Sequence, residues 1–295
     1  MQSLFPFMRD VISQLQQTNK LRTSETYQTT LKSFMQFREY KDVSFKDLNS
    51  DMMLMYEAYL RQRGLTKNSI SFYTRILRAV YNRAVEKGLT PNRNPFKHVY
   101  TGIDKTVKRA IRLKTIKQIK NLNLSFNPTL AFARDMFLFS FYTRGMSFID
   151  MAYLKKKNLS KSILSYRRRK TGQLLFIRWE ECMQEIVDKY ENPHSEYLLP
   201  IINPIHKNER TQYQNAMHLI NHKLKTIGEM TSLPIPLTMY VARHSWASAA
   251  KNKNIPISVI SEGMGHDSEK TTQIYLASLD TSEIDNANSI ILNSL

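Results

Sequence analysis

Four short segments in the second half of the chain contain residue types that could act together on a phosphate ester. They span residues 142–150, 167–172, 240–246 and 265–275, and they hold arginines, lysine, histidines and tyrosines. A guanidinium stays charged and donates two hydrogen bonds to a phosphate. Lysine and histidine can move a proton, and a tyrosine can attack phosphorus to form an ester. The set therefore suits attack on a phosphodiester by a tyrosine.

The wording and order of these segments resemble the tyrosine recombinase (phage integrase) family. Residues 240–244 resemble its His-x-x-Arg-His box, and Gly-His at 265–266 followed by Tyr275 resembles its Gly-His…Tyr box. Residues 170–172 resemble its β-hairpin lysine turn, and residues 142–150 resemble the box that opens its catalytic domain. The wording is most similar to integrases and invertases of Bacteroides-type mobile elements. The resemblance covers nearly the whole chain. It implies an enzyme that cuts and rejoins DNA through a covalent 3′-phosphotyrosine, without a metal or other cofactor.

The resemblance implies a catalytic role for five side chains in these segments. Tyr275 would be the nucleophile, and Arg243 and Arg144 would bind the phosphate oxygens. His266 would donate to the same oxygens or move a proton, and Lys170 would protonate the leaving 5′-oxygen. Each residue type also has an ordinary use, because many arginines form ion pairs, most tyrosines pack in cores, and a lysine in a basic run can simply hold phosphates.

Two positions depart from the family pattern. Tyr240 stands where the box usually begins with histidine, and its hydroxyl could still donate one hydrogen bond to a phosphate oxygen. Ser147 falls where the family's first arginine belongs. We therefore expect Arg144, three residues earlier, to reach the phosphate, with Ser147 supporting or replacing it. Asp150 is expected to orient a neighbouring arginine, and His244 is expected to have a structural or supporting role.

The first 88 residues predict a helical domain that resembles the family's core-binding, SAM-like DNA-binding domain. Helices are expected at about 24–40, 50–63 and 66–87, with caps at Ser24 and Thr66. The second helix would carry Met55, Ala58 and Tyr59. The outer face of the third helix is basic and could contact DNA, although a charged face can also be merely solvated. Its arginines are Arg75, Arg78 and Arg83.

The remaining chain predicts a linker and a second domain. Residues 89–108 lack a clear period and contain prolines, asparagines and a glycine, which indicates a linker. Residues 109–295 are expected to form a mostly α-helical catalytic domain with a small β-hairpin. Asn127-Pro128 predicts a helix start, and further helices are expected near 179–190, 208–227, 238–252 and 256–263.

The hairpin is predicted at residues 162–177, with its turn at Thr171-Gly172. The three arginines that precede Lys170, namely Arg167, Arg168 and Arg169, are expected to bind DNA. A last helix is expected at about 284–293, where Ile284, Ile290, Ile291 and Leu295 could dock on a neighbouring protomer or pack on their own domain.

The composition is consistent with a nucleic-acid partner. The chain has 295 residues and a net charge of +18, from 43 Lys and Arg against 25 Asp and Glu. Such an excess favours a polyanion, with nucleic acid ahead of membrane. Cys182 is the single cysteine, so no intramolecular disulfide can form, and no secretion signal is recognised. We therefore expect a bacterial cytoplasmic, nucleoid-associated protein.

The leading hypothesis is a site-specific recombinase acting on double-stranded DNA. By resemblance, four protomers would exchange strands between two sites, with accessory DNA-bending proteins as possible partners. Two alternatives stay open, namely a relaxing topoisomerase that uses the same phosphotyrosine step and a non-catalytic DNA-binding relative. His218 and His222 have the spacing of some zinc ligand pairs, but no third ligand is evident in the sequence.

Overall fold

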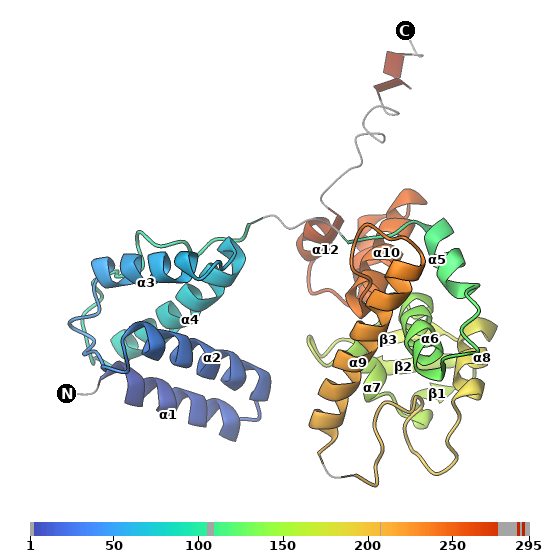
Figure 1. Cartoon of the computed structure of the whole chain (residues 1–295), viewed down its shortest axis with the longest axis horizontal. Coiled ribbons are helices and arrows are strands. Elements are labelled where there is room, and N and C mark those ends of the chain that lie inside the picture. The colour runs from blue at the N-terminus through green and yellow to red at the C-terminus, as the bar shows by residue number, and fades with distance from the viewer. Residues whose placement is uncertain (1–2, 105–108, 207, 277–287, 290, 293–295) are drawn as a thin grey trace. The chain divides into compact units, whose positions relative to one another are not determined.

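The structure is a computed structural model that describes residues 3–104, 109–206, 208–276, 288–289 and 291–292, without the side chains of Ile274 and Tyr275. The chain forms two compact units, Met1–Thr106 and Val107–Leu295 (Figure 1). Most of the expected last helix at 284–293 lies outside the described residues, including Ile284 and Ile290, and so does Leu295. Within the described part, no helix is both long enough and apolar enough to cross a membrane.

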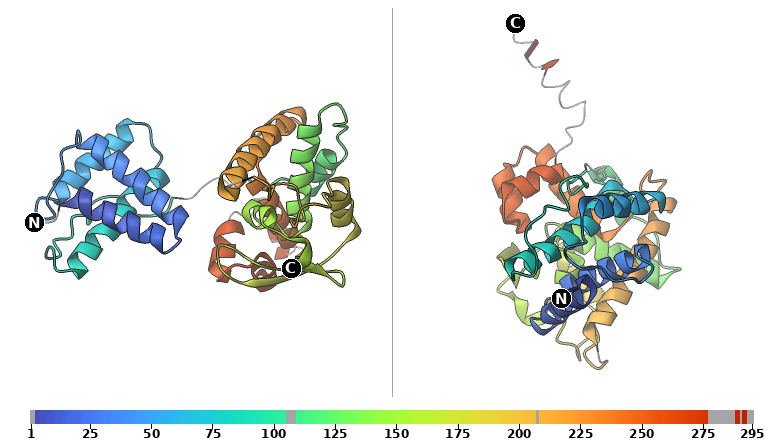
Figure 2. Two further views of the ribbon diagram at one scale, coloured as in Figure 1. Left: turned by 90° about the horizontal axis from the view of Figure 1, so that it is seen from below. Right: turned by 90° about the vertical axis from the view of Figure 1, so that its left-hand side faces the viewer.

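The first unit is a bundle of helices (Figure 2), and its core is rich in aromatic side chains. Phe34 and Tyr56 meet edge to face with ring centroids 5.0 Å apart. The hydroxyl of Tyr56 donates a 2.8 Å hydrogen bond to Ser33, so the buried phenol has a polar partner. The helices are α1 (Leu4–Gln17), α2 (Leu21–Phe37), α3 (Ser50–Gln62) and α4 (Lys67–Glu86).

The local signals predicted α4 well and α3 in part. Thr66 caps α4 by accepting from the Ser69 amide, and Gly88 follows the helix at a φ of +70°. α3 begins where expected, but it buries Met53, Tyr56 and Leu60 and exposes Met55 and Ala58. The apolar residues that the sequence singled out are thus not the ones that α3 buries, because large apolar residues lie on two different sides of this helix.

Two further differences concern the ends of elements in the first unit. Ser24 lies inside α2 and donates to the Leu21 carbonyl, because the helix starts three residues earlier than expected. Part of the expected linker packs on the first unit, where Phe96 and Val99 join its core. The buried hydroxyl of Thr74 donates to the Tyr100 carbonyl over 2.7 Å, which fixes this segment against α4.

The second unit is mostly helical, with a three-stranded antiparallel sheet in the order β1-β2-β3. The predicted hairpin is formed by β2 and β3, with Ser165 paired to Phe176. The strands are β1 (Leu159–Ser160), β2 (Ile163–Arg167) and β3 (Leu174–Arg178). The helices are α5 (Leu113–Lys120), α6 (Pro128–Tyr142), α7 (Phe148–Ala152), α8 (Glu181–Lys189), α9 (Glu209–Met230), α10 (Met239–Asn252), α11 (Ile257–Met264) and α12 (Glu269–Leu276).

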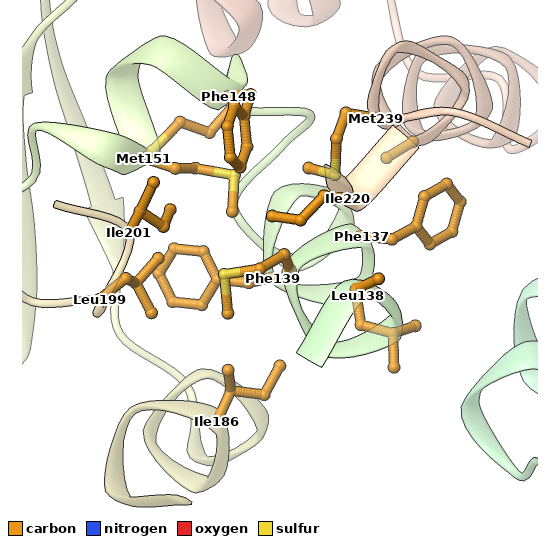
Figure 3. Close-up of a cluster of buried hydrophobic side chains, with 14 of the residues drawn as sticks. Phe137, Leu138, Phe139, Phe148, Met151, Ile186, Leu199, Ile201, Ile220 and Met239 are labelled. Carbon is orange, nitrogen blue, oxygen red and sulfur yellow. The ribbon is translucent and has the colours of Figure 1, made fainter. Parts of the chain in front are cut away.

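The central helix of the second unit is α6, which packs against α9 and α10. The Asn127 side chain caps it and Pro128 occupies its first turn, as the sequence predicted. Phe137 and Phe139 are fully buried and extend from different sides of α6 (Figure 3). A helix apolar on more than one side must be enclosed by other elements. α6 therefore provides a fixed support for the loop that follows it and for α10.

Candidate active site

Arg243 and His266 form a buried pair at the centre of the second unit. They are 5% and 9% exposed, respectively. Nη2 of Arg243 donates to Nε2 of His266 over 2.9 Å and to the Met264 carbonyl over 2.7 Å. Nη1 of Arg243 donates to the Gly145 carbonyl over 2.7 Å. These contacts join α10 to two of the segments that the sequence singled out, residues 142–150 and residues 265–275.

The contacts of His266 fix its tautomer. A guanidinium has no acceptor, so Nε2 must accept from Arg243 and the proton must lie on Nδ1. Nδ1 then donates to the hydroxyl of Thr272 on α12, 2.8 Å away. Burial, followed by the positive charges of Arg243, Arg168 and Lys170, lowers the pKa of His266 from 6.5 to about 4. The imidazole is therefore neutral at neutral pH.

Two glycines allow the backbone to approach these side chains closely. A Cβ on Gly145 would lie 2.7 Å from Cα of Arg243, and a Cβ on Gly265 would lie 3.1 Å from Cδ of Arg168. Both glycines also have positive φ, at +73° and +65°, which side-chain-bearing residues rarely adopt. The glycines beside Arg144 and His266 in the sequence are therefore required by local geometry.

The three arginines and Lys170 of the hairpin turn differ in their exposure to solvent. Arg168 is buried, whereas Arg167, Arg169 and Lys170 are exposed. The guanidinium of Arg169 lies 3.9 Å from the ring centroid of Tyr153. The amide of Gly172 donates to the Arg168 carbonyl over 2.7 Å, which closes the turn. Lys170 thus sits on an exposed turn whose base is held by a buried arginine.

Asp150 anchors the start of this turn. One carboxylate oxygen accepts from the Arg169 amide over 2.9 Å, and the other accepts from the Ser147 hydroxyl over 2.6 Å. The sequence predicted that Asp150 would orient an arginine, and the contact with Arg169 is through its backbone. Ser147 and the hairpin are joined through this one buried carboxylate.

A cavity of about 520 Å³ brings most of these residues together. Arg144 does not line it. The backbone of Arg144 has a φ of +60°, and its Cδ lies 3.7 Å from where a Cβ on Gly263 of α11 would be. The polar lining residues from the four segments are Ser147, Arg168, Lys170, Thr171, Tyr240, Arg243, His266, Asp267 and Thr271. Among the described residues, no cluster of acidic, histidine or cysteine side chains could hold a metal ion.

Tyr240 and His244 lie one turn apart on α10 and pack against each other. Their rings meet edge to face at 4.5 Å. Tyr240 is 53% exposed and lines the cavity, whereas His244 is 9% exposed. Tyr240, which stands where the family's box usually has histidine, therefore exposes its side chain to the cavity.

Tyr275 belongs to the last turn of α12, and its side chain lies outside the described part of the structure. It follows Thr272 by three residues, so the two positions are one helical turn apart. Thr272 was missed by the sequence reasoning, as was the burial of Arg168. A serine or threonine one turn before the tyrosine carries little signal alone. The burial of Arg168, in contrast, continues the strand alternation of Leu164 and Tyr166.

The basic face predicted on α4 belongs to the first unit. Arg75 and Arg78 are exposed, and Arg83 is half-buried with its guanidinium 5.9 Å from the ring centroid of Tyr27. Arg78 also donates to the Thr101 hydroxyl over 3.1 Å.

Two known families match the chain in order. The Phage integrase SAM-like domain matches residues 3–106, and the Phage integrase family matches residues 151–282. Tyrosine recombinase XerA of Thermococcus kodakarensis is 23% identical over 234 residues, which cover 78% of this chain and 77% of the relative. Tyrosine recombinase XerC of Treponema denticola is 25% identical over 276 residues, which cover 86% and 87%.

Solved structures share the fold at low sequence identity. A lambda integrase dimer bound to a COC′ core site has a TM-score of 0.70 at 14% identity, covering 93% of this chain and 77% of that chain. The Tn1549 transposon integrase in complex with a circular intermediate DNA has a TM-score of 0.70 at 13% identity, covering 99% and 100%.

The helical first unit, the second unit with its small sheet and the two matching families define a site-specific DNA recombinase. The chain belongs to the tyrosine recombinase (phage integrase) family.

Proposed function

We propose that this recombinase cuts one DNA strand with Tyr275 and holds it as a covalent 3′-phosphotyrosine at the cavity of Arg243 and His266. The observation that carries the proposal is the buried Arg243–His266 contact within a cavity that Lys170 also lines. Negative charge spreads over the phosphate oxygens in the transition state of such an attack, and fixed cationic donors stabilise it.

Each described group has a part in this reaction. Arg243 binds the phosphate oxygens, and Lys170, exposed on its turn, protonates the leaving 5′-oxygen. His266 is neutral in the free protein, and the negative charge of bound DNA favours its protonated, donating form. Tyr240 donates one hydrogen bond from the rim. Thr272 binds His266 one helical turn before Tyr275, which supports placing α12 beside the cavity.

The partner in this proposal is double-stranded DNA, held by the first unit and the catalytic cavity together. Arg75, Arg78 and Arg83 on α4, together with the exposed Arg167 and Arg169, would bind its phosphates. A lambda integrase tetramer has been solved bound to a Holliday junction. We extend a tetramer to this chain, with accessory DNA-bending proteins possible, acting on nucleoid DNA in the bacterial cytoplasm. Integration, excision and inversion all use the same step.

A nicked DNA substrate that carries the recombination site tests the proposal. Cleavage beside a nick releases a short fragment, so the covalent complex accumulates. The wild-type protein should give an adduct that resists SDS, and Tyr275→Phe should give none. No wild-type adduct on the correct site would favour a DNA-binding protein without catalysis. An adduct accompanied by relaxation but no rearranged DNA would favour a topoisomerase.

A further inference from the structure

Arg168 is buried without a full set of hydrogen-bond partners. Its side chain is 6% exposed, and its Nε is one of two buried side-chain nitrogens without a partner among the described residues. Nη1 donates to the Gly265 carbonyl, which holds one edge of the guanidinium in place. A buried, charged donor without an acceptor is costly, so an unpartnered Nε in this position indicates a ligand that supplies the acceptor.

No carboxylate neutralises Arg168 within the described residues. Asp267 is the one acidic residue that lines the cavity there, and it forms no ion pair with Arg168. Asp150 is engaged by Ser147 and by the Arg169 amide. The cavity thus contains two buried guanidiniums, those of Arg168 and Arg243, and an exposed lysine at its wall. Such an excess of positive charge suits an anionic ligand.

The backbone explains how Arg168 reaches the cavity. Leu164, Tyr166 and Arg168 are buried, whereas Ser165 between them is half-buried and Arg167 is exposed, so Arg168 continues the inward face of β2. The missing Cβ of Gly265 leaves room for its side chain. Nη1 is taken by Gly265, so the edge formed by Nε and Nη2 is the one that can donate two parallel hydrogen bonds.

We propose that Arg168 is the second arginine that binds the scissile phosphate, in the role that the sequence suggested for Arg144. Arg168 lines the cavity and carries an unpartnered donor, whereas Arg144 does not line it and Ser147 is bonded to Asp150. Arg168 and Arg243 then hold the non-bridging oxygens from β2 and α10. The proposal rests on the proposed phosphotyrosine reaction.

The test compares Arg168→Lys with Arg178→Lys and Arg144→Lys. Arg178 is an exposed arginine at the end of β3, the strand paired with β2, and it has no part in the proposed reaction, so its variant is the matched control. Lysine keeps the charge of Arg168 but loses the two-donor edge. In single-turnover cleavage of the nicked substrate, Arg168→Lys should lower the rate of adduct formation by about 100-fold or more. Arg178→Lys should remain within about threefold of wild type. Arg144→Lys tests the competing assignment of the same role.

A second substrate separates phosphate binding from a structural role. A methylphosphonate at the scissile position replaces one charged oxygen by a methyl group. If Arg168 stabilises the charge of that oxygen, wild type should cleave this substrate at most about tenfold faster than Arg168→Lys does. The reason is that neither protein can form the contact between residue 168 and the charged oxygen on this substrate. If Arg168→Lys fails to fold, Arg168→Gln, which keeps a donor for Gly265, is compared on the two substrates in the same way.

The outcomes distinguish this inference from the function on which it rests. An equal loss on both substrates, or a rate for Arg168→Lys within threefold of wild type, would overturn the role of Arg168 and leave the recombinase reaction intact. A 100-fold loss in Arg144→Lys with none in Arg168→Lys would assign the role to Arg144. Absence of any wild-type adduct that depends on Tyr275 would overturn both.

Discussion

Arg243 donates to Nε2 of His266 over 2.9 Å, and the opposite ring nitrogen of His266 donates to Thr272 over 2.8 Å. One buried chain of hydrogen bonds thus runs from α10 through the histidine to the helix that bears Tyr275. Since the arginine cannot accept a hydrogen bond, a proton on Nε2 would break this chain. The protonation state of His266 and its contact with Arg243 are therefore linked.

The pH dependence of stability should report this linkage. The pKa of His266 is about 4 in the folded protein and about 6.5 when unfolded. Between these values the unfolded state binds more protons, so the unfolding free energy should fall as the pH falls from 6.5 to 4, by up to about 3 kcal/mol from this residue. Above pH 7 His266 should contribute no pH dependence.

Urea unfolding of wild type and His266→Gln across pH 4–7 measures this effect. Glutamine can accept from Arg243 and does not titrate, so the variant should lose less stability on acidification than wild type does. The same pH dependence in both proteins would show that His266 is not held neutral.

Gly145→Ala should disturb the site by a steric clash. The new Cβ would lie 2.7 Å from Cα of Arg243, so α10 must move. Gly172→Ala is the matched control, because Gly172 has a similar φ of +76° but nothing within 4 Å of an added Cβ. Both variants bear a left-handed backbone cost of about 1–2 kcal/mol. Gly145→Ala should cost a further ~2 kcal/mol or more in unfolding free energy. Equal unfolding free energies for the two variants would contradict the close packing at Arg243.

Arg75 on α4 should contribute to DNA binding through phosphate contact. Arg75→Gln should weaken binding for all sequences and reduce the slope of log K against log salt concentration by about 1. Arg22→Gln is the control for net charge, because Arg22 is also exposed but pairs with Glu25 on α2 at 3.2 Å. Titrations of labelled DNA at several salt concentrations measure both. If the control lowers the slope as much as Arg75→Gln does, the effect is one of overall charge.

The elements that the sequence predicted well are those with local causes. Asn127 and Pro128 fix the start of α6 through a cap and a preset φ, and Gly88 permits the turn after α4. The buried face of α3 could not be predicted from its own sequence, because apolar residues lie on two sides of this helix. Packing against α2 and α4 decides which side is buried. The segment around Phe96 looked like a linker because its few apolar contacts are with distant residues.

The residues of the candidate site likewise fall into those that a local motif reveals and those whose position depends on the folded chain. Arg243 and His266 could be found from short motifs, and the structure places them in hydrogen-bond contact. The choice between Arg144 and another arginine depends on the chain reversal at Arg144-Gly145, where both residues have positive φ. No local pattern marks that reversal. The inward position of Arg168 could have been inferred from the two-residue period of β2, although three consecutive arginines suggested an exposed basic run.

Mass spectrometry of the protein–DNA adduct tests the central claim most directly. Trypsin cleaves after Lys270, so Tyr275 lies in the peptide that begins at Thr271. Tyr240 is one of two tyrosines that line the cavity, and it lies in a different peptide, which begins at Thr226 and ends at Arg243. After nuclease digestion of the trapped complex, the nucleotide mass should be found on Tyr275 alone. A nucleotide attached to Tyr240 or to any other residue would contradict the account.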